Sequence, residues 1–250
     1  MNMNLTEKLG LKLEPIGIFF GNTTAQCDLE PTADPRNCVI PFLMAAGHGK
    51  VVGMTEETCN CPGGSVGCCF GDGFTRRNPM IHKMLSQGFG DMAPPGMPEH
   101  LKEGERFFCT DELAMKWRNA MPFSDKGYPR IVFAPVSRWE EIGTPDLVYL
   151  FADPDQLSVL VTQLGCHNGR AMNTIAPYGA ACHSILFAAE QMEKEDPMAV
   201  MGLFDISQRR AGLANYLSLT VTYPMWEGMN RDLDKSCLTT HSWQEIEKRR

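Results

Sequence analysis

The sequence lacks the features that mark several large protein classes. The apolar stretch near the first cysteines, Val39 to Ala46, is interrupted by Pro41 and is far too short to cross a bilayer. The only basic run is the Lys248-Arg249-Arg250 tail, in a chain of formal net charge −7. The first eight residues lack the charged and apolar regions of a secretion signal. We therefore expect a cytoplasmic protein whose main partner is neither nucleic acid nor membrane.

Familiar catalytic motifs are missing as well. There is no phosphate-binding loop, no HExxH sequence and no paired-carboxylate signature. The segment Gly63 to Gly67 matches the nucleophile pattern G-x-S-x-G, but that motif needs a strand before its serine and a helix after it. Cysteines flank the segment instead, so we interpret the match as accidental. Asp205 and Arg209 are interpreted as a surface salt bridge rather than as a polar site.

What the chain does contain is a segment rich in cysteine and glycine, from Cys59 to Gly73. Four cysteines and five glycines fall within these fifteen residues. Glycine is unfavourable inside helices and strands, so we expect a loop here. Disulfides within the segment are poorly placed, because adjacent or next-but-one cysteines do not easily reach disulfide geometry. The four thiols are therefore predicted to bind a soft metal; they are Cys59, Cys61, Cys68 and Cys69.

Glycines fit a metal–sulfur site, because backbone N–H groups without a side chain beside them can approach a metal-bound sulfur closely. Gly63, Gly64 and Gly67 are the candidates for this cofactor-binding role. Ten cysteines in a cytoplasmic chain are not expected to form disulfides, because that compartment keeps thiols reduced. Sixteen methionines and ten cysteines also hint at an anaerobic host, since both residue types oxidise readily.

The spacing indicates a soft metal without naming it. Structural zinc sites use paired C-x2-C motifs, which this chain lacks, and ferredoxin-type spacing is also absent. An iron–sulfur cluster, 4Fe-4S or larger, is favoured because the chain offers more thiols than zinc needs. A non-enzymatic protein that binds or carries zinc or copper is one alternative. The other is that the thiols only pack and that the protein binds a small organic ligand between the sheet and its helices.

A second pair of cysteines lies far along the chain. Cys166 follows the end of a predicted helix at Gly165, and Cys182 lies near the start of another, where a helix N-terminus lowers the pKa of a thiol. Both are candidate ligands, although Cys182 can equally be a buried helix residue packed beside Ile185. The scattered residues Cys27, Cys109 and Cys237 are expected to be inert packing.

Strands and helices are predicted to alternate, which favours an α/β or mixed α+β fold with helices covering a central sheet. Residues 1–250 are expected to form one domain. The predicted strands are 15–20, 50–55, 106–109, 131–136, 147–151 and 216–222. The predicted helices are 38–46, 76–88, 111–120, 155–164 and 180–193, with a last helix capped by Ser242. Thr110 and Asp153 are predicted N-caps, Asp153 in a capping box with Gln156.

Several segments, in order along nearly the whole chain, resemble a family known as domain of unknown function 169. They are Leu9-Gly10-Leu11-Lys12-Leu13-Glu14-Pro15-Ile16-Gly17, Cys61-Pro62-Gly63-Gly64, Phe151-Ala152-Asp153-Pro154-Asp155-Gln156-Leu157, Ala181-Cys182, and Gly202-Leu203-Phe204-Asp205-Ile206-Ser207-Gln208-Arg209-Arg210. The resemblance supplies no reaction. The resemblance implies that the family has cysteines at the positions of Cys38, Cys61 and Cys182. It also implies that this branch of the family has added four further cysteines: Cys59, Cys68, Cys69 and Cys166.

The resemblance also sharpens the functional hypothesis. Three thiolates on a four-iron cluster leave one iron open, and such an iron can act as a Lewis acid on a small-molecule substrate. Four or more thiolates favour electron transfer to a partner protein instead. The sequence is compatible with an oxygen-sensitive enzyme and with a redox partner. It is also compatible with a homo-oligomer, because it does not determine the oligomeric state.

Overall fold

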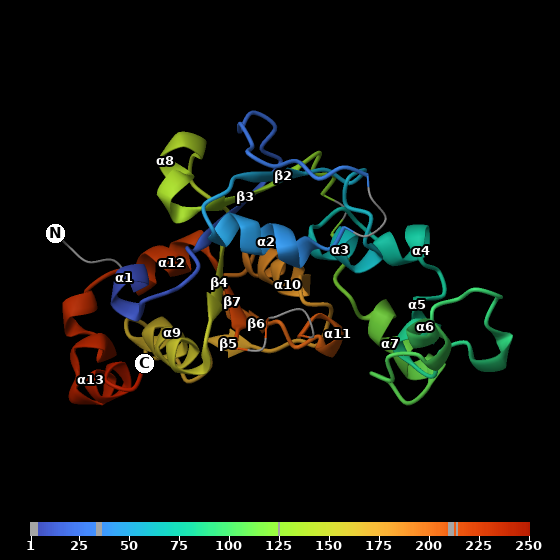
Figure 1. Cartoon of the computed structure of the whole chain (residues 1–250). Helices are drawn as coiled ribbons and strands as arrows, with labels where there is room; N and C mark the ends of the chain where they lie inside the picture. The colour runs from blue at the N-terminus through green and yellow to red at the C-terminus, as the bar shows by residue number, and fades with distance from the viewer. Residues whose placement is uncertain (1–4, 34–36, 125, 210–212, 214) are drawn as a thin grey trace.

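The computed structural model describes residues 5–33, 37–124, 126–209, 213 and 215–250. A seven-stranded sheet lies at the centre, in the order β2-β3-β1-β4-β7-β6-β5 (Figure 1). Its neighbouring strands are antiparallel, except for the parallel pair β5–β6. The strands are β1 Ile16–Phe20, β2 Val52–Met54, β3 Ile131–Pro135, β4 Leu147–Ala152, β5 Thr174–Ile175, β6 Ala199–Gly202 and β7 Leu217–Thr222. The expected mixed fold with a central sheet in a single domain is confirmed.

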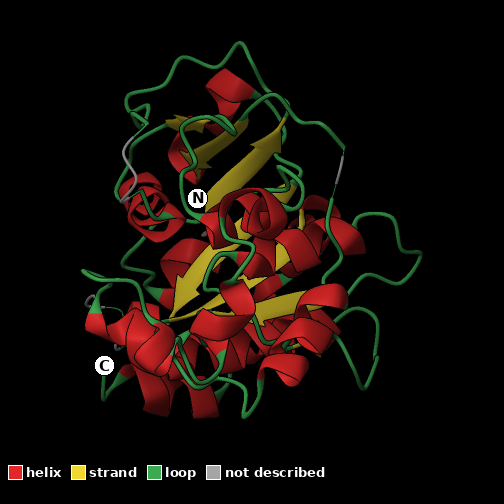
Figure 2. Ribbon diagram, turned by 90° about the vertical axis from the view of Figure 1, so that its right-hand side faces the viewer, coloured by secondary structure: helices red, strands yellow, loops and turns green. Residues whose placement is uncertain are grey.

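Both faces of the sheet are covered by helices (Figure 2). Strand β4 shows this best, because all of its residues are buried and alternate ones belong to different cores. Leu147, Tyr149 and Phe151 pack on the side of α2 (Val39–Gly47) and α10 (His183–Gln191). The intervening residues pack on the opposite side, in the core of α1 (Leu5–Leu9), α9 (Pro154–Gly165), α12 (Tyr223–Met229) and α13 (His241–Glu247).

A group of short helices forms a lobe beside the sheet, at the right of Figure 1. It contains α4 (Gly73–Arg77), α5 (Ile81–Leu85), α6 (Glu99–Glu103) and α7 (Asp111–Asn119). The lobe is attached through a third core, in which Phe74 and Ala114 pack with Val66 of α3 (Pro62–Gly67) and Leu186 of α10. The remaining short helices are α8 (Trp139–Ile142) and α11 (Ile206–Arg209). No helix among the described residues is both long and apolar enough to pass through a bilayer.

Local signals predicted several elements correctly. The Asp153 side chain accepts a hydrogen bond from the Gln156 N–H at 2.8 Å, and the Gln156 side chain accepts one from the Asp153 N–H at 2.9 Å, so the capping box is confirmed. Thr110 caps α7 by accepting a hydrogen bond from Leu113 N–H. The predicted strands that became β1, β2, β3, β4 and β7 are present with small changes at their ends.

Other predictions were wrong. The glycine-rich segment is not one loop, because Pro62–Gly67 forms α3 with Cys61 as its N-cap and Pro62 in its first turn. The predicted helix 76–88 is broken at Asn78-Pro79, since proline cannot donate to the helix ladder. Residues 106–109 form bends instead of a strand, with Arg106 at a φ of 54°. The last helix is capped by Thr240 and not by Ser242.

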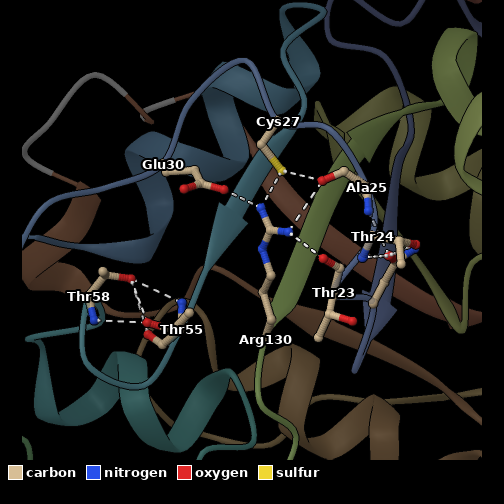
Figure 3. Close-up of polar contacts among 9 residues, drawn as sticks. Thr23, Thr24, Ala25, Cys27, Glu30, Thr55, Thr58 and Arg130 are labelled. Atoms are coloured by element: carbon tan, nitrogen blue, oxygen red, sulfur yellow. Dashed lines mark hydrogen bonds and ion pairs between the residues drawn. The ribbon is translucent and has the colours of Figure 1, made fainter.

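Arg130 ties the loop before α2 to the edge of the sheet (Figure 3). Its guanidinium donates to the carbonyls of Thr23 at 3.4 Å and Ala25 at 3.3 Å, lies 2.9 Å from the Cys27 sulfur, and pairs with Glu30. The guanidinium also packs against Gly53 of β2, because a Cβ added at Gly53 would collide with Arg130 Nη2. This one side chain therefore fixes the segment that precedes the first predicted metal ligand.

Replacing Arg130 with methionine should lower the free energy of unfolding by about 1–3 kcal/mol, because the largely buried guanidinium is lost together with its hydrogen bonds to the part-buried carbonyl of Ala25 and sulfur of Cys27. Urea unfolding followed by circular dichroism measures the change. Arg138→Met is the matched control: Arg138 pairs with the exposed carboxylate of Glu141, and its loss should change stability by less than about 1 kcal/mol. Equal losses in the two variants would contradict this role of Arg130.

Candidate functional site

Three cysteines from distant parts of the chain lie at the N-termini of three helices. Cys38 is the N-cap of α2, Cys61 the N-cap of α3 and Cys182 the N-cap of α10. All three line one cavity of about 150 Å³. Helices α2, α3 and α10 lie near one another in front of the sheet in Figure 1, and α3 contacts α10. The structure thus brings together the three cysteines that the family resemblance implied.

Two glycines of α3 allow this convergence. A Cβ at Gly67 would lie 2.7 Å from the Cys182 sulfur and 2.9 Å from the Cys182 carbonyl oxygen. A Cβ at Gly64 would lie 2.9 Å from Cγ2 of Val39. These separations are shorter than carbon atoms tolerate, so α3 can pack this closely against α2 and α10 only with glycine at both positions. Packing also explains why a glycine-rich segment is helical here.

The predicted cofactor-binding role of the glycines stays a prediction, and one contact bears on it. The N–H of Gly64 donates a hydrogen bond to the Cys61 sulfur at 3.3 Å. Gly63 lies beside the cavity, with its carbonyl oxygen 3.6 Å from the Cys182 sulfur. A backbone donor already directed at a thiol is the arrangement that stabilises negative charge on a metal-bound sulfur.

Cys59 and Cys68 lie in the interior behind the cavity wall. Thr55 and Thr58 close a turn directly before Cys59, with the N–H of Thr55 donating to Oγ1 of Thr58 at 3.0 Å (Figure 3). The thiols of Cys59 and Cys68 share a hydrogen bond, which lowers the pKa of Cys59 and raises that of Cys68. Neither residue lines the cavity, although Cys59 is close enough to raise the pKa of Cys61.

The structure does not bring Cys69 or Cys166 to this cavity. Cys69 has a φ of 61°, so the chain turns between it and Cys68 and its side chain joins the third core. Cys166 is exposed at the C-terminal end of α9. Cys27 and Cys237 are half-buried, whereas Cys109 is exposed, so the expectation of inert packing was wrong for Cys109.

The three cavity thiols are held in their neutral form. Burial raises the pKa of Cys38 to about 11 and raises those of Cys61 and Cys182 as well. The sulfurs also act on one another, because Cys61 raises the pKa of both Cys38 and Cys182. Three thiolates in one buried cavity therefore repel each other, and a cation between them would remove that repulsion.

His183, next to Cys182, has a structural role. Its Nδ1 accepts a hydrogen bond from the N–H of Ala180 at 3.1 Å, which leaves Nε2 to donate to the carbonyl of Gly63 at 3.1 Å. Burial lowers the pKa of His183 to about 4, so the ring is neutral near pH 7. The histidine thereby joins the N-terminus of α10 to that of α3.

Sequence reasoning missed the other walls of the cavity. Four aromatic side chains line it, contributed by α4, by α7 and by loops: Phe74, Phe107, Trp117 and Tyr178. Asp205, predicted to lie in a surface salt bridge, is buried and lines the cavity with Gln208, whose Oε1 accepts a hydrogen bond from the Cys38 thiol at 3.3 Å. No sequence spacing links the four aromatic residues, whereas Asp205 and Gln208 lie three positions apart in the segment 202–210 that carries the family resemblance.

The donor set suits a soft metal, but the side chains are not arranged as a finished ligand shell. Among the residues described, no group of three or more His, Cys, Asp or Glu side chains is placed to hold a metal ion. Cysteine thiolates are the ligands that iron–sulfur clusters, zinc and copper(I) share. Binding would require the side chains of Cys38, Cys61 and Cys182 to turn toward a common centre and lose their protons.

The model of the domain of unknown function 169 family, described as an uncharacterised ArCR, matches residues 4–230. The chain belongs to this family. The resemblance noted in the sequence is thereby confirmed. No curated protein and no solved structure matches the chain. Membership of the family assigns no reaction, so a function has to be inferred from the chemistry of the cavity.

Gly67→Ala should destabilise the protein by about 1–3 kcal/mol, because its methyl group collides with the backbone and sulfur of Cys182. Gly63→Ala is the matched control in the same helix. There the nearest atom to the new methyl would be Cβ of Ala180 at 3.3 Å, and alanine favours helix by up to about 1 kcal/mol, so stability should change little. Thermal unfolding of both variants measures the difference. Similar stabilities would show that α3 does not depend on this close packing.

Proposed function

We propose that this chain binds an iron–sulfur cluster, 4Fe-4S or larger, through Cys38, Cys61 and Cys182, and acts with it on a small molecule. The observation that carries the proposal is the placement of these three N-capping cysteines on one cavity. Their chain positions are far apart, so shared packing against a core would not by itself require all three residues to be cysteine.

Local electrostatics support an anionic group at this position. A cluster with thiolate ligands carries negative charge, and helix N-termini present unpaired N–H groups and a partial positive charge. Helices α2 and α10, nine residues each, begin at Cys38 and Cys182. The N–H of Gly64 is already bonded to the Cys61 sulfur. The same features lower the unfavourable energy of ionising three buried thiols when a metal arrives.

The number of thiols favours an enzyme over an electron carrier. Three cysteine ligands leave one iron of a four-iron cluster without a protein thiolate, and such an iron supplies Lewis-acid chemistry to a bound substrate atom. The cavity that the thiols line also has an aromatic wall, along which a small molecule can approach that iron. Asp205 and Gln208 are among the polar side chains on its wall that can orient that molecule.

Anaerobically purified or reconstituted protein is expected to be coloured and to contain about four iron and four sulfide per chain. Cys38→Ser, Cys61→Ser and Cys182→Ser should each lose most of the iron, while Cys109→Ser, an exposed cysteine, should retain it. Elemental analysis, sulfide determination and visible absorption provide the measurements. Folded protein that stays colourless would refute the proposal, and zinc or copper without sulfide would favour the alternative of a metal-carrying protein.

Variants of the two interior cysteines, Cys59 and Cys68, distinguish an enzyme from an electron carrier. If three thiolates suffice, Cys59→Ala and Cys68→Ala should keep about the full iron content, because neither side chain lines the cavity. Electron paramagnetic resonance of the reduced protein should then change when a small ligand binds the open iron. Loss of iron from either variant, with the circular dichroism spectrum unchanged, would assign that residue as a fourth ligand and favour electron transfer.

A further inference from the structure

The cavity has a second wall that the proposed metal chemistry does not use. Its aromatic rings contact one another, with ring centroids 6.0 Å apart for Phe74 and Trp117, 6.0 Å for Trp117 and Tyr178, and 5.7 Å for Phe107 and Tyr178. The indole N–H of Trp117 donates to the carbonyl of Tyr178 at 3.0 Å. Since this is the only polar group of the indole, what Trp117 can offer a ligand is an apolar ring.

The size of the cavity limits its occupant. A space of about 150 Å³ with largely apolar walls accepts one benzene-sized ring. The aromatic residues can contact such a ring edge to face or in offset stacks. Ile81, Met84 and Leu85 add aliphatic surface to the same wall.

No cationic side chain lies on the described part of the cavity wall. None of the described residues that line the cavity is a lysine or an arginine, and His183 is neutral because both of its ring nitrogens are engaged. The positive charge offered to an occupant is therefore the partial charge at the N-termini of α2 and α10, on the cysteine side.

The polar groups beside the aromatic wall suit a hydroxyl group. Asp205 accepts hydrogen bonds, and Gln208 provides an amide. Burial and the nearby Asp205 carboxylate raise the pKa of the Tyr178 hydroxyl, so it stays protonated and can donate. A ligand hydroxyl can therefore donate to the Asp205 carboxylate, whose Oδ1 also accepts hydrogen bonds from Ser207, or accept a hydrogen bond from the tyrosine.

We propose that the cavity binds an uncharged, single-ring aromatic molecule that bears a hydroxyl group, that is, a phenol. Its binding rests on the cavity walls alone and not on the proposed function. A space of about 150 Å³ does not hold this ring and a cluster together, so the assignment is made for the metal-free chain.

The test uses metal-free full-length protein, kept reduced and anaerobic, with phenol as the probe. Ligand-observed nuclear magnetic resonance and titration calorimetry should show saturable binding at one site. Benzene, which has the same ring but no hydroxyl group, should bind at least about tenfold more weakly, because it cannot hydrogen-bond to Asp205 or Tyr178. Cyclohexanol should also bind more weakly, because it lacks the aromatic face. Benzene binding as tight as phenol would overturn the proposal.

Two neighbouring phenylalanines provide a matched pair of variants. Phe107 lines the cavity, whereas Phe108 contacts Trp117 and Tyr178 without lining it. Phe107→Ala should weaken phenol binding about tenfold, and Phe108→Ala should change it by less than about threefold. Should Phe107→Ala fail to fold, Phe107→Leu keeps the volume and removes the ring. Equal weakening in both positions would overturn the assignment of the wall.

The outcomes separate this inference from the proposed function. Phenol binding to a chain that never takes up iron would leave the cavity assignment standing and refute the cluster. Iron and sulfide in a chain whose metal-free form shows no phenol binding would refute the inference and leave the cluster standing.

Discussion

The closeness of α3 to the N-terminus of α10 sets the geometry of the site. Without a side chain at Gly67, the α3 backbone lies against the sulfur and carbonyl of Cys182, and without one at Gly64 it lies against Val39 at the start of α2. Helix α3 is thereby held between two longer helices that belong to the core of the sheet. The position of Cys61 relative to Cys38 and Cys182 follows from this packing and not from the local sequence.

This dependence explains why the sequence predicted the sheet better than the site. Strand β4 and the capping box at Asp153 arise from residues adjacent in the chain, and their pattern is unambiguous. The segment 62–67 has poor helix propensity, yet it is helical because contacts with α2 and α10 outweigh an unfavourable term of about 1 kcal/mol per glycine. Propensity cannot detect that compensation, since it depends on Val39 and Cys182, which lie 25 and 115 positions away from the glycines they contact.

The candidate ligands also divide into those that the sequence could identify and those that only the fold reveals. The family resemblance singled out Cys38, Cys61 and Cys182, and these are the cysteines that share a cavity. Composition alone could not separate Cys68 from Cys69, because a single backbone turn with a φ of 61° sends the two side chains to different cores. The aromatic wall was unpredictable for another reason: Trp117 and Tyr178 meet only after the α4–α7 lobe has packed against α10.

Burial connects the two sides of the cavity. The same removal from water that raises the pKa of the three thiols makes any isolated charge in the cavity unfavourable. On the cysteine side, this means that ionised thiols need a cation bound among them, which makes metal binding and proton release one event. On the aromatic side, it means that the favoured occupant is neutral and brings its own hydrogen-bonding group to Asp205 and Tyr178. A metal centre and an uncharged aromatic ligand are thus two consequences of one low-dielectric space of about 150 Å³, and each is expected to exclude the other from it.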